Sequence, residues 1–286
     1  MSVRRREITV DNIRSPILES GPAAENEAVL FVHGNPGSSA DWEQLVRQAG
    51  QIGRAVAIDM PGFGRADKPP SFPYSVTGYA RHIQRLVQAL GLTRVHLVAH
   101  DFGGAWGLAW AANNLSSLAS LTLIDIGVLR GYRWHRYARI WRLPLLGELF
   151  NALVATAPVR RALLSRARAG GVPRDHVQRM LTDFDRGTRR AVLRLYRSNV
   201  DRDTRRAMLA SLRQYTGPVL VLWGRRDPYV PVEFAERQKE VWPQARVVVF
   251  DESGHWPMLD APERTASAVV PFLRAHVRHH TPRAPT

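Results

Sequence analysis

Residues 95–106 constrain the fold of this chain more than any other part of the sequence. They begin with an apolar, β-branched run that is typical of a buried strand. The run breaks at Gly103-Gly104 and continues into residues 105–112, which we expect to be helical. Small side chains at Ala99 and Gly103 stand two positions before and two after Asp101, so the strand and the helix can pack closely. This strand–turn–helix layout predicts that Asp101 projects from a strained turn, as in a nucleophile elbow.

The identity of Asp101 limits the chemistry of such a turn. Enzymes with this layout commonly carry a serine there, whereas this chain carries a carboxylate. An attacking carboxylate forms an ester with an alkyl carbon. It is poorly suited to splitting ordinary carboxylic esters. We therefore expect an enzyme that opens a bond between a saturated carbon and a heteroatom, rather than an esterase or lipase.

The composition excludes several other classes of protein. The chain has 286 residues, of which 45% are hydrophobic and 23% charged, which suits a folded chain with a core. It has no cysteine, so disulfides, cysteine nucleophiles and thiolate metal sites are excluded. No apolar run reaches about 18 residues, and the basic residues 1–7 precede no apolar stretch. We expect no membrane span and no secretory signal, with a cytoplasmic location as the default.

The net charge of +15 is concentrated in one part of the chain. Residues 128–213 contain 20 arginines and six acidic residues, so they carry +14 of this charge. Such a segment could attract nucleic acid, anionic lipid or an anionic substrate. The simpler interpretation is a solvated, arginine-rich helical surface. No nucleic-acid-binding motif is present, so we expect no nucleic-acid partner.

Strand and helix patterns alternate along most of the chain. Strands are expected near residues 7–10, 14–19, 28–33, 54–59, 118–126, 218–223 and 246–250, and helices near 40–49, 76–90, 232–241 and 262–276. This alternation predicts an α/β fold with a mostly parallel twisted sheet flanked by helices. Residues 128–213 show helical patterns alone. We therefore predict an α/β core domain of residues 1–127 and 214–286 and an inserted helical cap domain of residues 128–213.

Polar residues follow two of the predicted strands. Asp227 comes just after strand 218–223, and His255 comes just after strand 246–250. Functional groups in open α/β sheets gather at the carboxyl ends of the strands, so these side chains are expected near Asp101. The order nucleophile, acid, base is that of the α/β-hydrolases. Asp125, at the end of strand 118–126, is an alternative acid or a loop-capping carboxylate.

The sequence resembles the α/β-hydrolases, and within them the Asp-nucleophile branch that contains epoxide hydrolases and haloalkane dehalogenases. The resemblance extends over nearly the whole chain. It rests on His33-Gly34-Asn35-Pro36, Asp59-Met60-Pro61-Gly62-Phe63-Gly64, His100-Asp101-Phe102-Gly103-Gly104, Asp227 and Gly254-His255-Trp256. These motifs together are specific for the fold but not for the substrate.

The resemblance implies a reaction in two steps. Asp101 attacks a saturated carbon and forms an alkyl ester, and His255 then activates a water molecule that hydrolyses this ester. Asp227 orients the imidazole of His255, as the buried acid does in a triad. The backbone N–H groups of Phe102 and Asn35 form the oxyanion hole. Neither a metal ion nor an organic cofactor is implied.

An epoxide oxygen leaves as an alkoxide and needs a donor that stabilises or protonates it. Epoxide hydrolases take such donors from cap tyrosines. Residues 192–198, with Tyr196, resemble the late cap segment that holds one of them. Tyr132 and Tyr137 are the candidates for a second cap donor.

A halide leaves as an anion and needs N–H donors. Dehalogenases typically carry a tryptophan directly after the nucleophile, together with an asparagine or a second tryptophan. This chain has Asn35 in the corresponding loop, but Phe102 provides no donor. Trp134 and Trp141 could substitute for the missing donor, although nothing in their spacing requires it.

We therefore expect an epoxide hydrolase-like enzyme acting on a small hydrophobic organic substrate and water, as a monomer or homodimer. Haloalkane dehalogenase is the alternative. A non-catalytic ligand-binding protein on a hydrolase scaffold is a second alternative, against which the complete set of Asp101, Asp227 and His255 counts.

Overall fold

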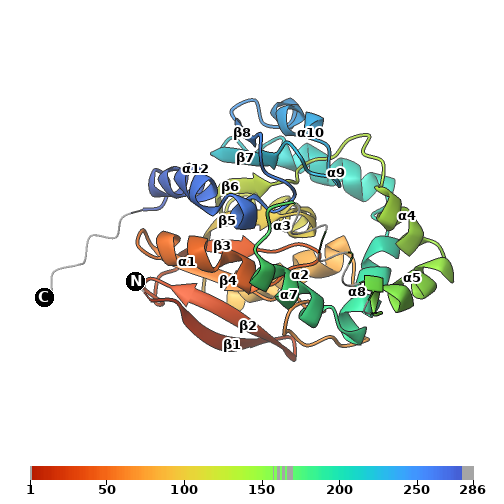
Figure 1. Ribbon diagram of the computed structural model, residues 1–286. Helices are drawn as coiled ribbons and strands as arrows, with labels where there is room; N and C mark the ends of the chain where they lie inside the picture. The colour runs from red at the N-terminus through yellow and green to blue at the C-terminus, as the bar shows by residue number, and fades with distance from the viewer. Residues whose placement is uncertain (1, 157, 160–161, 163–164, 166–169, 279–286) are drawn as a thin grey trace, which may run out of the picture.

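The computed structural model describes residues 2–156, 158–159, 162, 165 and 170–278 (Figure 1). In this part of the chain eight strands form one sheet in the order β1-β2-β4-β3-β5-β6-β7-β8. The strands are β1 (Arg4–Val10), β2 (Ile13–Ser20), β3 (Glu27–Val32), β4 (Arg54–Ile58), β5 (Arg94–His100), β6 (Leu118–Ile124), β7 (Val219–Gly224) and β8 (Arg246–Phe250). The expected α/β fold with a mostly parallel sheet is confirmed.

The direction of the strands follows their place in the chain. β1 and β2 form an antiparallel hairpin, and β2 also pairs antiparallel with β4. The other neighbouring strands, which follow the order β4-β3-β5-β6-β7-β8 across the sheet, all run parallel to one another. The chain passes from β3 to β4 on one side and then crosses to β5 on the other side of β3. This switch point is where open α/β sheets bind ligands.

Helices cover both faces of the sheet. The core helices are α1 (Glu43–Ala49), α2 (Val76–Ala89), α3 (Phe102–Ala111), α10 (Glu233–Glu236), α11 (Pro257–Asp260) and α12 (Pro262–Arg274), with 3-10 turns η1 (Ser39–Trp42) and η2 (Arg237–Glu240). Trp42 and Val269 belong to the apolar layer beneath α1 and α12. On the opposite face Tyr79 of α2 stacks on Trp106 of α3, with ring centroids 3.9 Å apart. The two layers bury the sheet on both sides.

Two helices differ clearly from the expectation, and one further helix was not expected. α3 begins at Phe102 rather than at residue 105, because Asp101 alone makes the turn and the two glycines pack within the first helical turn. The helix expected at 232–241 is short and passes into a 3-10 turn. α11, a four-residue helix after His255, was not predicted because it begins at a proline in a loop-like stretch.

Between β6 and β7 the described elements are all helices. They are α4 (Arg136–Arg142), α5 (Leu146–Val154), α7 (Arg174–Asp183), α8 (Arg186–Arg197) and α9 (Arg202–Leu212). Asp185 and Asp201 are the N-cap residues directly before α8 and α9. Their carboxylates accept hydrogen bonds from backbone N–H groups in the first turn. In Figure 1, α4, α5 and α8 lie at the end of the molecule opposite α12.

The described helices include none that is both long and apolar enough to cross a membrane.

Candidate active site

Asp101 occupies a strained turn between β5 and α3. Its backbone has φ 49° and ψ −129°, a conformation that L-residues rarely adopt. The turn is tight because a Cβ at Gly103 would lie 2.4 Å from the carbonyl oxygens of Val32 and His33. A Cβ at Gly34 would lie 2.4 Å from the Cβ of Asp101. Both positions must be glycine for the loop after β3 to approach the elbow this closely.

The structure brings Asp101, His255 and Asp227 together at the carboxyl edge of the sheet. Asp101 Oδ2 lies 3.5 Å from His255 Nε2, and Asp227 Oδ2 lies 2.7 Å from His255 Nδ1. Asp101 Oδ1 accepts a hydrogen bond of 2.8 Å from the backbone N–H of Asn35. Phe102 is the first residue of α3, so its N–H belongs to the turn that helices leave without an internal partner. One imidazole thus bridges two carboxylates.

The charges of this set are strongly coupled. Burial opposes ionisation of Asp101, but the hydrogen bond and charge of His255 lower the pKa of Asp101 to about 2. Burial alone would lower the pKa of His255, whereas the charges and hydrogen bonds of Asp227 and Asp101 raise this pKa well above its usual value. In the resting protein Asp101 is therefore an anion and His255 a cation at neutral pH.

Asp227 and Asp125 have different partners. Asp227 Oδ1 accepts hydrogen bonds from the N–H groups of Tyr229 (2.7 Å) and Val230 (3.0 Å), which leaves Oδ2 directed at His255. Asp125 Oδ1 accepts from the N–H of Gly224 at 2.8 Å. Burial and the neighbouring charge of Asp227 raise the pKa of Asp125 well above its usual value, which favours the neutral form of this carboxyl.

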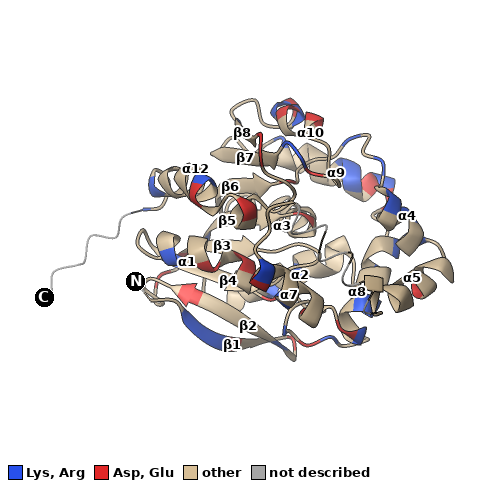
Figure 2. Ribbon diagram, in the orientation of Figure 1, with Lys and Arg blue, Asp and Glu red and all other residues tan. Residues whose placement is uncertain are grey.

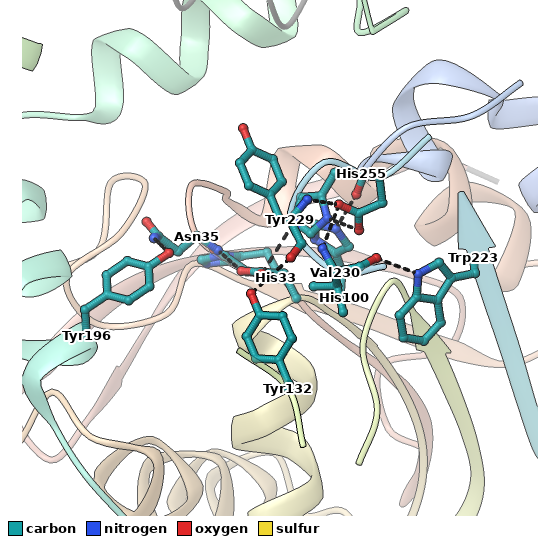
Figure 3. Close-up of polar contacts among 12 residues, drawn as sticks. His33, Asn35, His100, Tyr132, Tyr196, Trp223, Tyr229, Val230 and His255 are labelled. Carbon is teal, nitrogen blue, oxygen red and sulfur yellow. Dashed lines mark hydrogen bonds and ion pairs between the residues drawn. The ribbon is translucent and has the colours of Figure 1, made fainter. Parts of the chain in front are cut away.

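Two buried histidines hold the loops that carry the site (Figure 3). His33 Nε2 accepts from the N–H of Met60 at 2.9 Å, which leaves the Nδ1 proton for the carbonyl of Gly34 at 2.8 Å. His100 Nε2 lies 2.7 Å from the carbonyl oxygen of His255. Burial lowers the pKa of His100 to about 3, so this ring is neutral and acts as a donor. These residues position the loops.

A cavity of about 240 Å³ opens in front of Asp101. Its wall includes Asn35, Asp101, Phe102, Ile126, Leu129, Tyr132, Trp134, His135, Tyr137, Trp141, Phe150, Val154, Met180, Phe184, Tyr196, Tyr229, His255 and Trp256. Most of these side chains are apolar or aromatic, and the polar groups in contact with Asp101 are the backbone N–H of Asn35 and the imidazole of His255. Such a site suits a small apolar ligand with one reactive polar group.

Tyr196 comes from α8 and is only 4% exposed. Its ring stacks on Trp141 at 5.0 Å between centroids and meets Phe102 edge-on at 5.1 Å. The side-chain Nδ2 of Asn35 lies 3.5 Å from the hydroxyl oxygen of Tyr196. Figure 3 shows the two side chains facing each other. Burial raises the pKa of Tyr196 well above its usual value, so the phenol keeps its proton. A neutral O–H donor therefore stands at the cavity wall beside Asn35.

The two other candidate donors differ. Tyr132 donates its hydroxyl proton to the carbonyl of Tyr229 at 3.0 Å (Figure 3), so this proton is engaged elsewhere. The hydroxyl of Tyr137 accepts from Arg136 at 2.8 Å and keeps its own proton, so Tyr137 stays the candidate for a second donor.

The two tryptophans proposed as halide donors do not act as a pair. Trp141 donates its N–H to Asn151 Oδ1 at 2.8 Å, so this proton does not face the cavity. Trp134 stacks on Phe102 with centroids 6.1 Å apart. With the Trp141 proton engaged, these two side chains do not supply two N–H donors to a halide.

His135 is a cavity residue that the sequence did not reveal. It caps α4, and its Nδ1 accepts a hydrogen bond of 3.2 Å from the N–H of Ala138. A neutral imidazole that accepts at Nδ1 carries its proton at Nε2. Burial lowers the pKa of His135 to about 4, so the ring is neutral and offers one N–H donor. A histidine before a helix in an arginine-rich segment has no sequence signature of a site.

Within the described part of the chain, no group of three or more His, Asp or Glu side chains is arranged to hold a metal ion.

The sequence matches the family model described as alpha/beta hydrolase fold over residues 27–262. Cis-3-alkyl-4-alkyloxetan-2-one decarboxylase of Xanthomonas campestris pv. campestris is 27% identical over 281 residues, covering 90% of this chain and 91% of the relative. Lipase 1 of Psychrobacter immobilis is 27% identical over 272 residues, with 89% and 81% covered. The crystal structure of epoxide hydrolase VrEH1 from Vigna radiata shares the fold, with a TM-score of 0.78, 20% identity, and 96% and 98% covered.

Proposed function

The chain belongs to the alpha/beta hydrolase fold family, and from this premise we propose that it is an epoxide hydrolase that works through an ester on Asp101. The observation that carries the proposal is the pairing of an elbow carboxylate with a neutral phenol, Tyr196, at one small apolar cavity. Lipases of this fold use a serine at the elbow. A carboxylate there cannot repeat their acyl transfer and instead suits displacement at a saturated carbon.

In the first step Asp101 Oδ2 attacks a ring carbon of the epoxide. A C–O bond forms between Asp101 and this carbon while the ring C–O bond breaks, and the electron pair stays on the epoxide oxygen. Tyr196 gives its proton to this oxygen and regains one from solvent. The Nε2 proton of His135 supports the same oxygen as a hydrogen-bond donor. Preorganised donors of this kind act where charge develops in the transition state.

The second step uses a change in the charge of Asp101. Esterification removes its negative charge and with it one of the contributions that keep His255 protonated. His255 then releases its proton and becomes a base for water. The water oxygen attacks the ester carbon, and the oxyanion on Oδ1 lies against the N–H groups of Asn35 and Phe102. Collapse breaks the acyl C–O bond, and the leaving alkoxide takes the proton that remains on the former water oxygen. The diol is released, Asp101 is restored as a carboxylate, and the proton taken from water leaves His255 as a cation again.

Asp227 is proposed as the acid that orients His255, because its 2.7 Å contact to Nδ1 leaves Nε2 facing Asp101. Residues 128–213 are proposed as the cap domain over this site, since α4 and α8 bring His135 and Tyr196 to the cavity. We propose no catalytic role for Asp125. Substitution of Asp125 is therefore the control for substitution of Asp227.

A second candidate is hydrolytic opening of an oxetan-2-one ring. It is favoured by the similarity of the chain to the Xanthomonas oxetanone decarboxylase, which extends over nine-tenths of both proteins. Such a ring also presents a saturated carbon to Asp101. Its leaving group is a carboxylate that needs no proton, so turnover would depend less on Tyr196 than epoxide opening does. Dehalogenation is the weaker alternative, because the side chain of Phe102 has no hydrogen-bond donor and the indole N–H of Trp141 is donated to Asn151.

The test is a set of parallel assays on one preparation of the full chain. Diol formation from aryl and alkyl epoxides, ring opening of dialkyl oxetan-2-ones and bromide release from bromoalkanes are measured side by side. His255→Gln should let the ester form but not hydrolyse, so intact-mass spectrometry should show an adduct of substrate mass on Asp101. Bromide release without any diol would overturn the epoxide assignment. Failure of all three assays, with no adduct, would favour a ligand-binding protein.

A further inference from the structure

The large apolar side chains exposed on the described part of the chain lie in one stretch, residues 134–153. Five of them are leucines, which we call the leucine patch: Leu143 (48% exposed), Leu145 (83%), Leu146 (54%), Leu149 (57%) and Leu153 (47%). Single exposed leucines are common on protein surfaces, whereas a contiguous set indicates a surface that another phase or molecule covers. In Figure 1 this stretch, at α4 and α5, lies at the outer margin of the molecule.

α5 is apolar on both its inner and its outer side. Phe150 and Val154 point inward and line the cavity. Leu146, Leu149 and Leu153 follow one another at spacings of three and four, so they form one stripe on the exposed side. A helix that is apolar all round is normally buried. α5 therefore lacks the polar outer face that a helix facing bulk water would have.

The single acidic residue of α5 does not provide such a face. Glu148 is bound by Arg197, with Oε1 2.6 Å from Nη1 and Oε2 2.8 Å from Nη2. Asn151 is directed inward, where it bonds to Trp141 and to the carbonyl of Arg189. The polar groups of the helix are thus used in holding it to α4 and α8.

Leu145 adds an independent observation. It lies at the tip of the turn between α4 and α5, with φ 65°, in the left-handed region that leucine rarely adopts. It is also the most exposed of the large apolar residues. Neither burial nor backbone preference accounts for a leucine at this position. Strained residues of this kind concentrate at functional sites.

The surroundings of the leucine patch are cationic. Residues 128–156 contain five arginines and one acid, Glu148, which is already paired. Arg133, Arg136 and Arg139 are exposed beside the patch. Figure 2 shows blue segments on α4 next to a largely uncharged α5. A second copy of this chain would bring two such arginine groups together, whereas an anionic lipid surface would satisfy both the leucines and the arginines.

We propose that the leucine patch docks on an anionic phospholipid membrane surface. The leucines lie at the boundary between head groups and acyl chains, and the arginines of α4 lie at the phosphates. Phe150 and Val154 on the inner side of α5 then stand between the bilayer and the cavity. A lipophilic epoxide dissolved in the membrane would reach the site through this side of the protein, and this last point rests on the proposed function.

The test is flotation of the full chain with large unilamellar vesicles, read without any substrate. One set is pure phosphatidylcholine, and the other contains about 30% phosphatidylglycerol to provide a negative surface. The double variant Leu145→Asn/Leu149→Gln removes two patch side chains. Asparagine tolerates the positive φ at residue 145 and glutamine suits a helix, so the fold should persist. Thermal melting of each variant checks this.

We expect the wild-type chain to float with the anionic vesicles and less with neutral ones, and added salt to weaken binding. The double leucine variant should bind at least about tenfold more weakly, because each substitution replaces the branched apolar end of a leucine with a polar amide. Arg139→Glu should also weaken binding. Arg274→Glu, an exposed arginine on α12 at the opposite end, is the matched control and should bind as the wild type does.

Three results would overturn the proposal. They are no flotation with anionic vesicles, equal flotation of the wild type and the leucine variant, and a self-association of the wild type that the leucine variant loses without any vesicle binding. The last result would identify a second copy as the partner. Turnover of a water-soluble epoxide should be unchanged in the leucine variant. Vesicle binding and turnover are read separately, so failure of one does not imply failure of the other.

Discussion

The two walls of the cavity are built in different ways. On the sheet side, hydrogen bonds to the backbone hold the functional groups. Asp101 accepts from the N–H of Asn35, Asp227 accepts from the N–H of Tyr229, and the ring of His100 bonds to a main-chain carbonyl. The first and the last of these bonds join segments at the ends of different parallel strands, and the second fixes the loop after β7. Their positions are therefore set by the sheet itself.

On the helical side, ring packing and arginine side chains hold the corresponding groups. Tyr196 stacks on Trp141, and Arg142 donates to the carbonyl of Tyr196 at 2.6 Å. Arg197 donates to the carbonyls of Trp141 and Leu143. Arg142 and Arg197 thus tie helices of this segment together through backbone carbonyls. These two arginines do more than contribute to a solvated surface.

This difference separates two roles. We expect the sheet side to hold the groups without which no covalent step occurs, and the helical side to set which leaving group is assisted. Substitutions on the sheet side should therefore abolish turnover of every substrate. Substitutions on the helical side should change rates selectively. The predictions below test this division, from the largest effect to the smallest.

The largest effect is expected for Asp101→Ala. This change removes the attacking carboxylate, and turnover of every substrate should fall by at least about 10⁴-fold, in the range seen when a covalent nucleophile is lost. Steady-state rates and a thermal melt should be measured together, since the fold should be retained. Near wild-type turnover would contradict the proposed mechanism.

The second effect distinguishes the two buried acids. Asp227→Asn disturbs the orientation and charge of His255, and loss of such an acid can lower turnover by about 10⁴-fold in a serine protease triad. The raised pKa of Asp125 favours its neutral form, which asparagine resembles, and an asparagine Oδ1 can still accept from the N–H of Gly224, so Asp125→Asn should have little effect on turnover. Single-turnover hydrolysis of the ester measures this step directly. The reverse order of damage would assign the acid to Asp125.

The third effect tests the helical side. Tyr196→Phe removes the proton donor but keeps the ring stack on Trp141, so epoxide turnover should fall at least tenfold, or about 1.4 kcal/mol. Tyr132→Phe is the matched control, because the hydroxyl proton of Tyr132 is already donated to the carbonyl of Tyr229, and it should have a smaller effect. Comparison with an oxetan-2-one substrate sharpens the test. An equal loss on both substrates would show that Tyr196 does not act on the leaving group.

A smaller effect is expected for His135→Asn. Asparagine is a good helix cap and can replace the bond to the N–H of Ala138, but its shorter side chain withdraws the N–H donor from the cavity. Loss of one hydrogen bond of about 1 kcal/mol would lower kcat/KM for an epoxide by about fivefold. If His135→Asn leaves kcat/KM unchanged while His135→Ala lowers thermal stability, His135 is a cap alone.

The last prediction concerns protonation rather than turnover. The charges of Asp227 and Asp101 both raise the pKa of His255, so removing one of them in Asp101→Ala should lower this pKa. The imidazole should then lose its proton at a lower pH than in the wild type, which NMR titration of the ring can measure. An unchanged or higher pKa would remove the proposed link between esterification and formation of the base.

The local sequence determined much of the fold and of the sheet side of the site. Apolar runs of strand length, the turn at Asp101 and the positions of Asp227 and His255 just after two strands are local features. Parallel strands bring their carboxyl ends to one edge, so local order translates directly into spatial proximity. The prediction was wrong in details such as the start of α3, because a single strained residue can make the whole turn.

The tertiary structure alone decided the helical side. The use of the Trp141 N–H by Asn151, the approach of Tyr196 to Asn35 and the tautomer of His135 all depend on how side chains meet. Helices in an insertion share no sheet that would fix their relative positions. Their contacts join residues far apart in the sequence, through packing and side-chain hydrogen bonds whose geometry no local pattern specifies.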